Sequence, residues 1–232
     1  MNGRQKRLTA TVLHVRNFGD AHRIVEVLTA EEGRVSALAR NARASKRRFA
    51  GVLDLFATLE LELIPANGLW QLESARLSQA RLGLRSDLQR LQRANLCCEA
   101  VRLLVAEHQA AALVHDALIS ALDCLETGDL LGAASFYPRL LAAAGIAPDF
   151  AVCVRCGNRP HRVAGVDVDR GGVVCTGCAP TRPALPHGAV ATFGGAACVD
   201  TESADAVLSC ALDWVEAQAG RSLRSRQFSH NL

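Results

Sequence analysis

No stretch of this chain approaches the run of about 18 apolar residues that a membrane-spanning helix requires. The basic residues Arg4, Lys6 and Arg7 are not followed by the apolar run of a secretory signal. We therefore expect a cytoplasmic protein that does not contact membranes. Half of the residues are hydrophobic and 21% are charged, a balance typical of a globular chain and not of a disordered one.

Several enzyme motifs are also absent. The sequence contains no Gly-rich nucleotide loop ending in Gly-Lys-Ser/Thr, no His-Glu-x-x-His metalloprotease signature and no His-x-Glu tripeptide of the zinc deaminases. No cluster of carboxylates suggests a two-metal nuclease, and the seven histidines are scattered. We expect a protein without enzymatic activity; an RNA-directed enzyme with an unrecognised site is an alternative.

Aromatic residues and lysine are scarce. Aromatics make up 4% of the chain, and Lys6 and Lys46 are the only lysines among 26 basic residues. Proteins that bind single-stranded nucleic acid usually stack bases on aromatic rings, so we expect any such binding here to depend on charge and not on base sequence. The guanidinium fork of arginine suits phosphate, although an arginine-rich proteome would produce the same bias.

Positive charge is concentrated near the start of the chain. Residues 1–48 carry a net charge of +7 and the remainder −4, an asymmetry that indicates a polyanionic partner. Five cations lie within nine residues of the stretch Arg40–Arg48, which we expect to be a loop between two strands. Such a loop can neutralise several phosphates; a solvated charged loop without a ligand is the alternative.

Four of the nine cysteines form two close pairs, Cys153-x-x-Cys156 and Cys175-x-x-Cys178, separated by 18 residues. This spacing is typical of a zinc ribbon or knuckle. Gly157 and Gly177 are expected to have a positive φ that turns backbone N–H groups toward sulfur. Four thiolates leave no open position for catalysis, so the spacing predicts a structural Zn²⁺. Two disulfides, a thioredoxin-type redox motif and chance are the alternatives.

The residues up to about position 77 alternate between apolar and polar, most clearly in Thr58–Leu63, and they predict five short strands. Five strands in so short a segment favour an OB-fold barrel, with an SH3-like barrel as the alternative. From Ser86 the apolar period becomes helical. We expect helices from Ser86, from Leu113 to Leu125, from Asp129 to Ala144 with a kink at Pro138, and from a cap at Thr201 to Gly220.

The predicted fold class is therefore α+β with several domains: an N-terminal OB-fold β-barrel and a C-terminal α-helical domain with an inserted four-cysteine zinc module. We place the barrel at residues 1–80 and the first helical part at 81–150. The zinc module is placed at 151–182, and the second helical part with a basic tail at 183–232. A zinc-stapled adaptor that binds protein and not DNA would have the same organisation.

Three stretches resemble the RecO family of bacterial DNA repair proteins, which are recombination mediators. They are Gly19–Val25 in the barrel, Leu140–Pro148 running into Cys153-x-x-Cys156, and the tail Gly220–Arg226. The second is the most specific, because a helix, Gly145, Pro148 and the first cysteine pair follow in this order after an N-terminal barrel.

The resemblance implies binding of single- and double-stranded DNA, annealing of complementary strands, and partnership with RecR and single-strand-binding protein, so that RecA loads on coated DNA. Family DNA contacts lie in the basic strand and loop of the barrel. This role is carried here to Arg34, Arg40, Arg43, Lys46, Arg47 and Arg48. Asn41 stands where family members often have glycine. The implied zinc ligands are Cys153, Cys156, Cys175 and Cys178.

Overall fold

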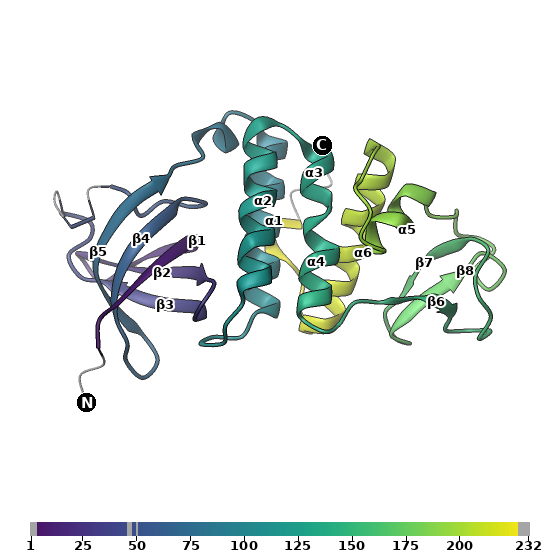
Figure 1. The fold of residues 1–232 in the computed structure, drawn as a ribbon, viewed down its shortest axis with the longest axis horizontal. Helices are drawn as coiled ribbons and strands as arrows, with labels where there is room; N and C mark the ends of the chain where they lie inside the picture. Colours follow the sequence, from purple (N-terminus) through teal and green to yellow (C-terminus); the bar gives the residue numbers. More distant parts are fainter. Residues whose placement is uncertain (1–3, 46–47, 50, 227–232) are drawn as a thin grey trace.

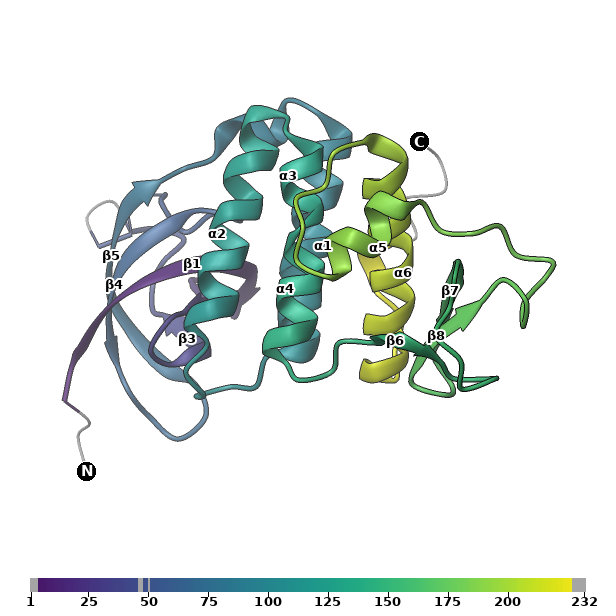
Figure 2. The same ribbon diagram turned by 45° about the vertical axis from the view of Figure 1, so that its right-hand side comes forward.

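The computed structural model describes residues 4–45, 48–49 and 51–226. A β-barrel, a layer of helices and a small three-stranded module follow one another along an elongated molecule (Figure 1). The barrel and the three-stranded module lie at opposite ends, with the helices between them in a second view as well (Figure 2). This arrangement confirms the predicted fold class, while the exact domain limits stay a prediction.

The barrel is closed in the strand order β1-β2-β3-β5-β4. Neighbouring strands are antiparallel except for β3 and β5, which pair in parallel. An irregularity between Val12 and His14 interrupts the long strand β1, which pairs with β4 before it and with β2 along most of its length. This is the closed five-stranded barrel of the OB type. Its strands are β1 (Lys6–Phe18), β2 (His22–Thr29), β3 (Gly33–Ala39), β4 (Thr58–Ile64) and β5 (Trp70–Gln79).

Alternation along the strands fills the barrel. In β4, Leu59, Leu61 and Leu63 are buried whereas Glu60 is exposed. Successive side chains of a strand point to opposite faces, so the period-two pattern in the sequence places every leucine of this strand inside. The prediction for this strand is confirmed.

The helices pack around one apolar core. Side chains from the barrel and from the three-stranded module also belong to this core. Among the described residues, the structure has no helix that is both long and apolar enough to cross a membrane. The helices are the 3-10 turn η1 (Leu82–Arg85), α1 (Leu88–Leu104), α2 (Ala112–Thr127), α3 (Leu130–Ala134), α4 (Phe136–Ala143), α5 (His187–Phe193) and α6 (Thr201–Ala219).

The helix expected from Asp129 to Ala144 is instead two helices, α3 and α4, that meet at Ser135. The proline ring clashes with the carbonyl four residues earlier, here that of Ala134, and this is where α3 ends. Pro138 is thus the third residue of α4, in the first turn, where a missing N–H costs no intrahelical hydrogen bond. The prediction of one kinked helix is wrong, because Pro138 lies in the first turn of a second helix that begins at Phe136.

The cap of the last helix is one residue earlier than expected. Asp200, not Thr201, is the N-cap of α6, and its carboxylate accepts hydrogen bonds from the Ser203 backbone N–H at 2.7 Å and the Ser203 hydroxyl at 2.8 Å. These hydrogen bonds lower the pKa of Asp200.

A buried arginine joins the barrel to the helices. No part of the Arg81 side chain is exposed, and its Nε donates to Asp123 of α2 at 2.8 Å. Its Nη1 donates to the Phe56 carbonyl at 2.7 Å and to the Thr58 hydroxyl at 2.8 Å, both in the barrel. The guanidinium therefore connects both units, because its fork of N–H donors reaches acceptors on either side.

Replacing Arg81 by methionine is expected to lower the free energy of unfolding by about 3 kcal/mol, because the buried Phe56 carbonyl and Thr58 hydroxyl lose their donor. Urea unfolding followed by circular dichroism measures this difference. The control is Arg85→Met, which removes a half-exposed pair with Asp54 and is expected to change stability by at most about 1 kcal/mol. Equal effects of the two substitutions would contradict the role given to Arg81.

The three-stranded module contains β6 (Asp149–Cys153), β7 (Val163–Asp167) and β8 (Gly172–Cys175) in the order β6-β8-β7. Val163, Val166 and Val173 belong to the core of the helical layer and not to a core of the module. Phe150 stacks on Phe193 of α5, with ring centroids 4.9 Å apart. The module is therefore attached to the helices through its sheet, while its other side carries the cysteines.

Candidate nucleic-acid interface and metal centre

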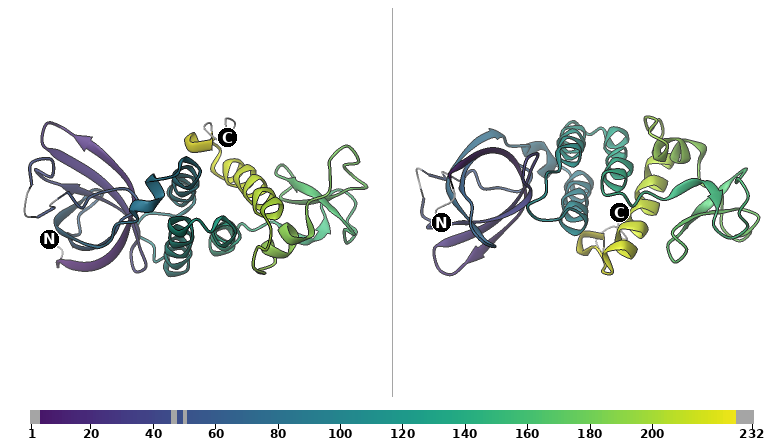
Figure 3. Two further views of the ribbon diagram at one scale, coloured as in Figure 1. Left: turned by 90° about the horizontal axis from the view of Figure 1, so that it is seen from above. Right: turned by 60° about the horizontal axis from the view of Figure 1, so that its bottom comes forward.

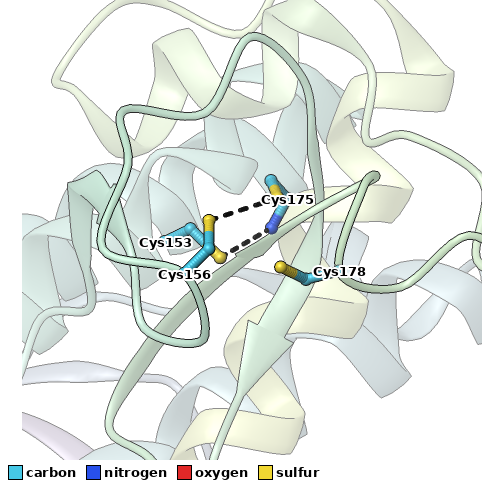
Figure 4. A group of neighbouring side chains, drawn as sticks. All are labelled: Cys153, Cys156, Cys175 and Cys178. Atoms are coloured by element: carbon cyan, nitrogen blue, oxygen red, sulfur yellow. Dashed lines mark hydrogen bonds between the residues drawn. The ribbon is translucent and has the colours of Figure 1, made fainter.

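The four cysteines predicted as ligands come together at one end of the three-stranded module. Their Sγ atoms all lie within 4.8 Å of one another, and those of Cys156 and Cys175 are 3.9 Å apart (Figure 4). Metal–sulfur bonds of about 2.3 Å place the corners of a tetrahedron about 3.8 Å apart. The cluster thus has the size of a tetrahedral thiolate site, and the four residues could bind one metal ion.

The sheet and two tight turns position these side chains. Cys153 and Cys175 end the parallel strands β6 and β8. After Cys153 the chain turns through Gly157, which has a φ of 74° and donates its N–H to the Cys153 carbonyl at 2.8 Å. The positive φ predicted there is confirmed. For Gly177 it is wrong, because that turn closes through the N–H groups of Cys178 and Ala179, both donating to the Cys175 carbonyl.

Backbone N–H groups favour the thiolate form of one of the four cysteines, Cys153. Cys153 is buried, and the N–H of Cys175 points at its Sγ from 3.4 Å. Backbone N–H groups of Cys175, and then of Cys156 and Arg155, lower the pKa of the Cys153 thiol to about 6. Hydrogen bonds among the other sulfurs instead raise the pKa of Cys178 to about 12. Without a cation the four thiols cannot all ionise together, and a bound metal ion supplies the missing positive charge.

One residue of this centre was not predicted from the sequence. Arg155 forms an ion pair with Asp167 of β7 at 2.9 Å and donates to the Cys178 carbonyl at 3.3 Å. It therefore connects the first cysteine turn to the second. Its position between Cys153 and Cys156 was a possible signal, but the partner on β7 is set by the fold.

The basic stretch forms a loop between β3 and β4, as predicted, and we name residues 40–49 the basic loop. Ala42 and Phe49 of this loop are buried in the barrel core, so the chain is held against the barrel at these two residues. Arg43 donates its N–H to the Ala21 carbonyl at 3.1 Å in the turn between β1 and β2. Lys46 and Arg47 lie outside the described residues.

Asn41 adopts the left-handed conformation that glycine would favour at this position. Its φ is 56°, and its N–H donates to Nδ1 of His22 at 2.9 Å. Asparagine is one of the few residues that tolerate this region. The path of the loop directly after Arg40 is thus available to this chain without glycine.

Three of the predicted arginines are exposed on this loop, and none of them has an acidic partner among the described residues: Arg40, Arg43 and Arg48. Arg43 donates to the Asp20 carbonyl at 2.7 Å and Arg48 to the Arg40 carbonyl at 2.9 Å. The Arg48 guanidinium also lies over the Phe49 ring, 5.2 Å from its centroid. Carbonyl contacts and ring stacking orient Arg43 and Arg48 but leave the charge of these guanidinium groups uncompensated.

Arg34 occupies a different place from the other predicted arginines. Arg34 and Arg40 are six positions apart, which corresponds to about 20 Å of extended chain along β3. Its Nη1 lies 3.2 Å from Glu107 and its Nε donates to the Val105 carbonyl at 3.1 Å, both in the connection between α1 and α2. Arg34 thus contacts the helical layer, and the structure does not bring it together with the basic loop.

These features define a class of protein, namely an OB barrel with an uncompensated basic loop, joined to a helical domain that holds a four-thiolate cluster. The chain matches the family model "Recombination protein O N terminal" over residues 1–81 and "Recombination protein O C terminal" over residues 85–227. The chain belongs to the RecO family. This membership supports a role in DNA repair and recombination.

Curated relatives agree with this assignment. A DNA repair protein RecO of Anaeromyxobacter sp. (strain K) is 40% identical over 185 residues, which cover 76% of this chain and 72% of that protein. That of Anaeromyxobacter dehalogenans (strain 2CP-C) is 35% identical over 243 aligned positions, covering 96% of this chain and 94% of the relative. That of Cutibacterium acnes is 34% identical and covers 77% of this chain and 75% of the relative.

Proposed function

We propose that this chain is a recombination mediator that binds single- and double-stranded DNA through the basic loop of its barrel and anneals complementary strands. The observation that carries the proposal is the loop itself: Arg40, Arg43 and Arg48 are exposed and have no acidic partner among the described residues, and hydrogen bonds orient Arg43 and Arg48. Lys46 and Arg47 add two charges to the same segment of sequence. Arg34 contributes to the barrel–helix contact and is the weakest of the proposed DNA contacts.

Annealing by such a surface requires no bond chemistry. Two DNA strands repel each other, and a cationic surface that holds both lowers this repulsion and raises their local concentration. The exposed aromatic surface near the basic loop is small, because Phe49 is buried and Phe18 is about half exposed. Bases that are not stacked on the protein remain free to pair with the complementary strand.

We further propose that the four cysteines hold one Zn²⁺ and that this ion is structural. Four thiolates close the tetrahedral shell and leave no position for a substrate. Within the part of the chain that the structure describes, the small core on this side of the module has four buried members, Cys153, Ala164, Val174 and Ala179. So few side chains do not stabilise a fold, and a bound ion replaces the missing core.

Membership of the family extends the proposal to partners. RecR and single-strand-binding protein are the proposed protein partners, and loading of RecA on coated single-stranded DNA is the proposed result. The proposal involves no enzymatic turnover.

The test of the proposed function is the annealing of two complementary oligonucleotides followed by fluorescence. At low salt the protein is expected to accelerate annealing about tenfold or more, and the acceleration is expected to disappear at high salt, where charge is screened. A protein that leaves the annealing rate unchanged at low salt would contradict the proposal and favour an adaptor that binds only proteins.

A further inference from the structure

The basic tail, residues 220–226, does not extend into solvent. After Gly220, where φ is 63°, the chain turns back beside α1 on the barrel side of α6 (Figure 3). Leu223 is buried in the helical core. The carboxylate of Glu99 on α1 accepts hydrogen bonds from the N–H groups of Arg224 at 2.8 Å and Ser225 at 2.9 Å. The backbone of the tail is therefore fixed.

Two of its three arginines are left uncompensated. Arg226 forms ion pairs with Asp213 at 2.6 Å and with Glu216 at 2.7 Å, so it stabilises the turn. Arg221 and Arg224 are exposed and have no ion pair within the part of the chain that the structure describes. Hydrogen bonds thus position the backbone of the tail, whereas the guanidinium groups of Arg221 and Arg224 remain available to a ligand.

These two arginines line a cleft of about 600 Å³ between the tail, α1 and the barrel, which we name the tail cleft. The charged groups of the opposite wall are paired with one another. Arg102 donates to both oxygens of Glu26, at 2.7 and 3.0 Å, and Arg34 lies 3.7 Å from the same carboxylate. The charged side chains of the lining are Arg34, Arg102, Arg221 and Arg224 against Glu26 and Glu99. Glu26 compensates Arg102, and Glu107 outside the lining compensates Arg34, so Arg221 and Arg224 against Glu99 leave an excess of one positive charge, at the tail.

A third uncompensated arginine connects the tail cleft with the basic loop. His14 lines the cleft, and Arg16 lies two residues further along β1, on the same face of the strand. Arg16 is exposed and has no ion pair among residues 4–45, 48–49 and 51–226. Beyond it, β1 ends in the turn whose Asp20 and Ala21 carbonyls hold Arg43. Positive groups thus follow one side of the barrel from the loop to the cleft.

We propose that the tail cleft is a second contact for the phosphodiester backbone of single-stranded DNA, which passes from the basic loop over Arg16 to Arg221 and Arg224. The inference rests on the proposed function and extends it to a path that covers both domains. The polar lining favours a phosphate chain over an apolar peptide, because only Leu13 and Leu103 contribute aliphatic side chains. The continuity with the basic loop favours nucleic acid over an acidic protein segment.

The test compares an oligonucleotide of about 5 nucleotides, which fits one OB barrel, with one of about 25 nucleotides. In the variant Arg221→Ala/Arg224→Ala, affinity for the long strand is expected to fall about tenfold, and the slope of log K against log[salt] to become about 1.4 less steep. Binding of the short strand is expected to stay unchanged. Thermal melting checks that both proteins are folded.

The matched control is Arg159→Ala/Arg162→Ala, which removes two exposed arginines without described ion pairs from the three-stranded module. It is expected to bind both strands like the wild type. Unchanged affinity and slope for the long strand in the tail variant would overturn the inference, and so would an equal loss in the control.

The failures are distinguishable. A wild type that binds both strands with equal affinity keeps the proposed function but overturns the second contact, whereas a wild type that binds neither overturns both. A tail variant that keeps its DNA affinity and loses affinity for poly-glutamate would place an acidic protein segment in the cleft, which also overturns the proposal.

Discussion

Replacing Cys175 by serine is expected to release the metal ion and to abolish the cooperative folding of the three-stranded module. A structural zinc ion contributes on the order of 10 kcal/mol or more to the folding of a small domain, and the remaining core on the cysteine side cannot compensate. The loss is expected to extend into the helical layer, because Val166, Val173 and Phe150 pack against it. Stoichiometric zinc, one ion per chain, is expected in the wild type.

Metal content and thermal melting followed by circular dichroism measure these effects. The control is Cys124→Ser on α2, a half-buried cysteine outside the cluster, which is expected to retain one zinc ion and most of its stability. A strong chelator is expected to reproduce the Cys175→Ser result in the wild type. Full stability of Cys175→Ser, with or without chelator, would contradict a structural metal.

Removing the charge of the basic loop is expected to weaken DNA binding on the order of 100-fold at low salt, whatever the base sequence. The variant Arg40→Gln/Arg43→Gln/Arg48→Gln removes three phosphate contacts, which lowers the salt slope by about 2 for single strands. Glutamine retains a donor for the carbonyl contacts of Arg43 and Arg48, so the loop is expected to stay in place. Fluorescence anisotropy at several salt concentrations measures both quantities.

The matched control removes the same number of charges from arginines that already have acidic partners. Arg7 pairs with Glu62, Arg76 with Glu60 and Arg85 with Asp54. The variant Arg7→Gln/Arg76→Gln/Arg85→Gln is expected to keep most of the affinity. If this control lost as much affinity as the loop variant, binding would follow the total charge of the protein and not the basic loop.

Local patterns in the sequence were sufficient for the barrel and the cysteine cluster. The alternation in Thr58–Leu63 determines which side of β4 faces inward, since the strand period of two leaves no other register. The spacing within each Cys-x-x-Cys pair is a property of a single turn. Both patterns involve only residues that are close together in the sequence, so they could be recognised without knowledge of the fold.

Features that depend on distant segments could not be predicted in this way. Arg34 is a residue type that often contacts phosphate, but here Glu107 and the Val105 carbonyl, both from another domain, bind its guanidinium. The tail arginines have the same sequence character, and only the fold separates Arg226, which is paired, from Arg221 and Arg224. The helix break at Ser135 differs in origin, because proline was recognised but its position in a first turn was not.

The central claim is that the barrel binds the DNA backbone by charge, and the most direct test is the affinity of the wild-type protein for an unstructured oligonucleotide across a salt series. We expect log K to fall linearly with log[salt], with a slope of about −2 or steeper if three or more loop cations contact phosphates. Failure to retain the oligonucleotide in dilute buffer, or an affinity that does not change with salt, would contradict the account.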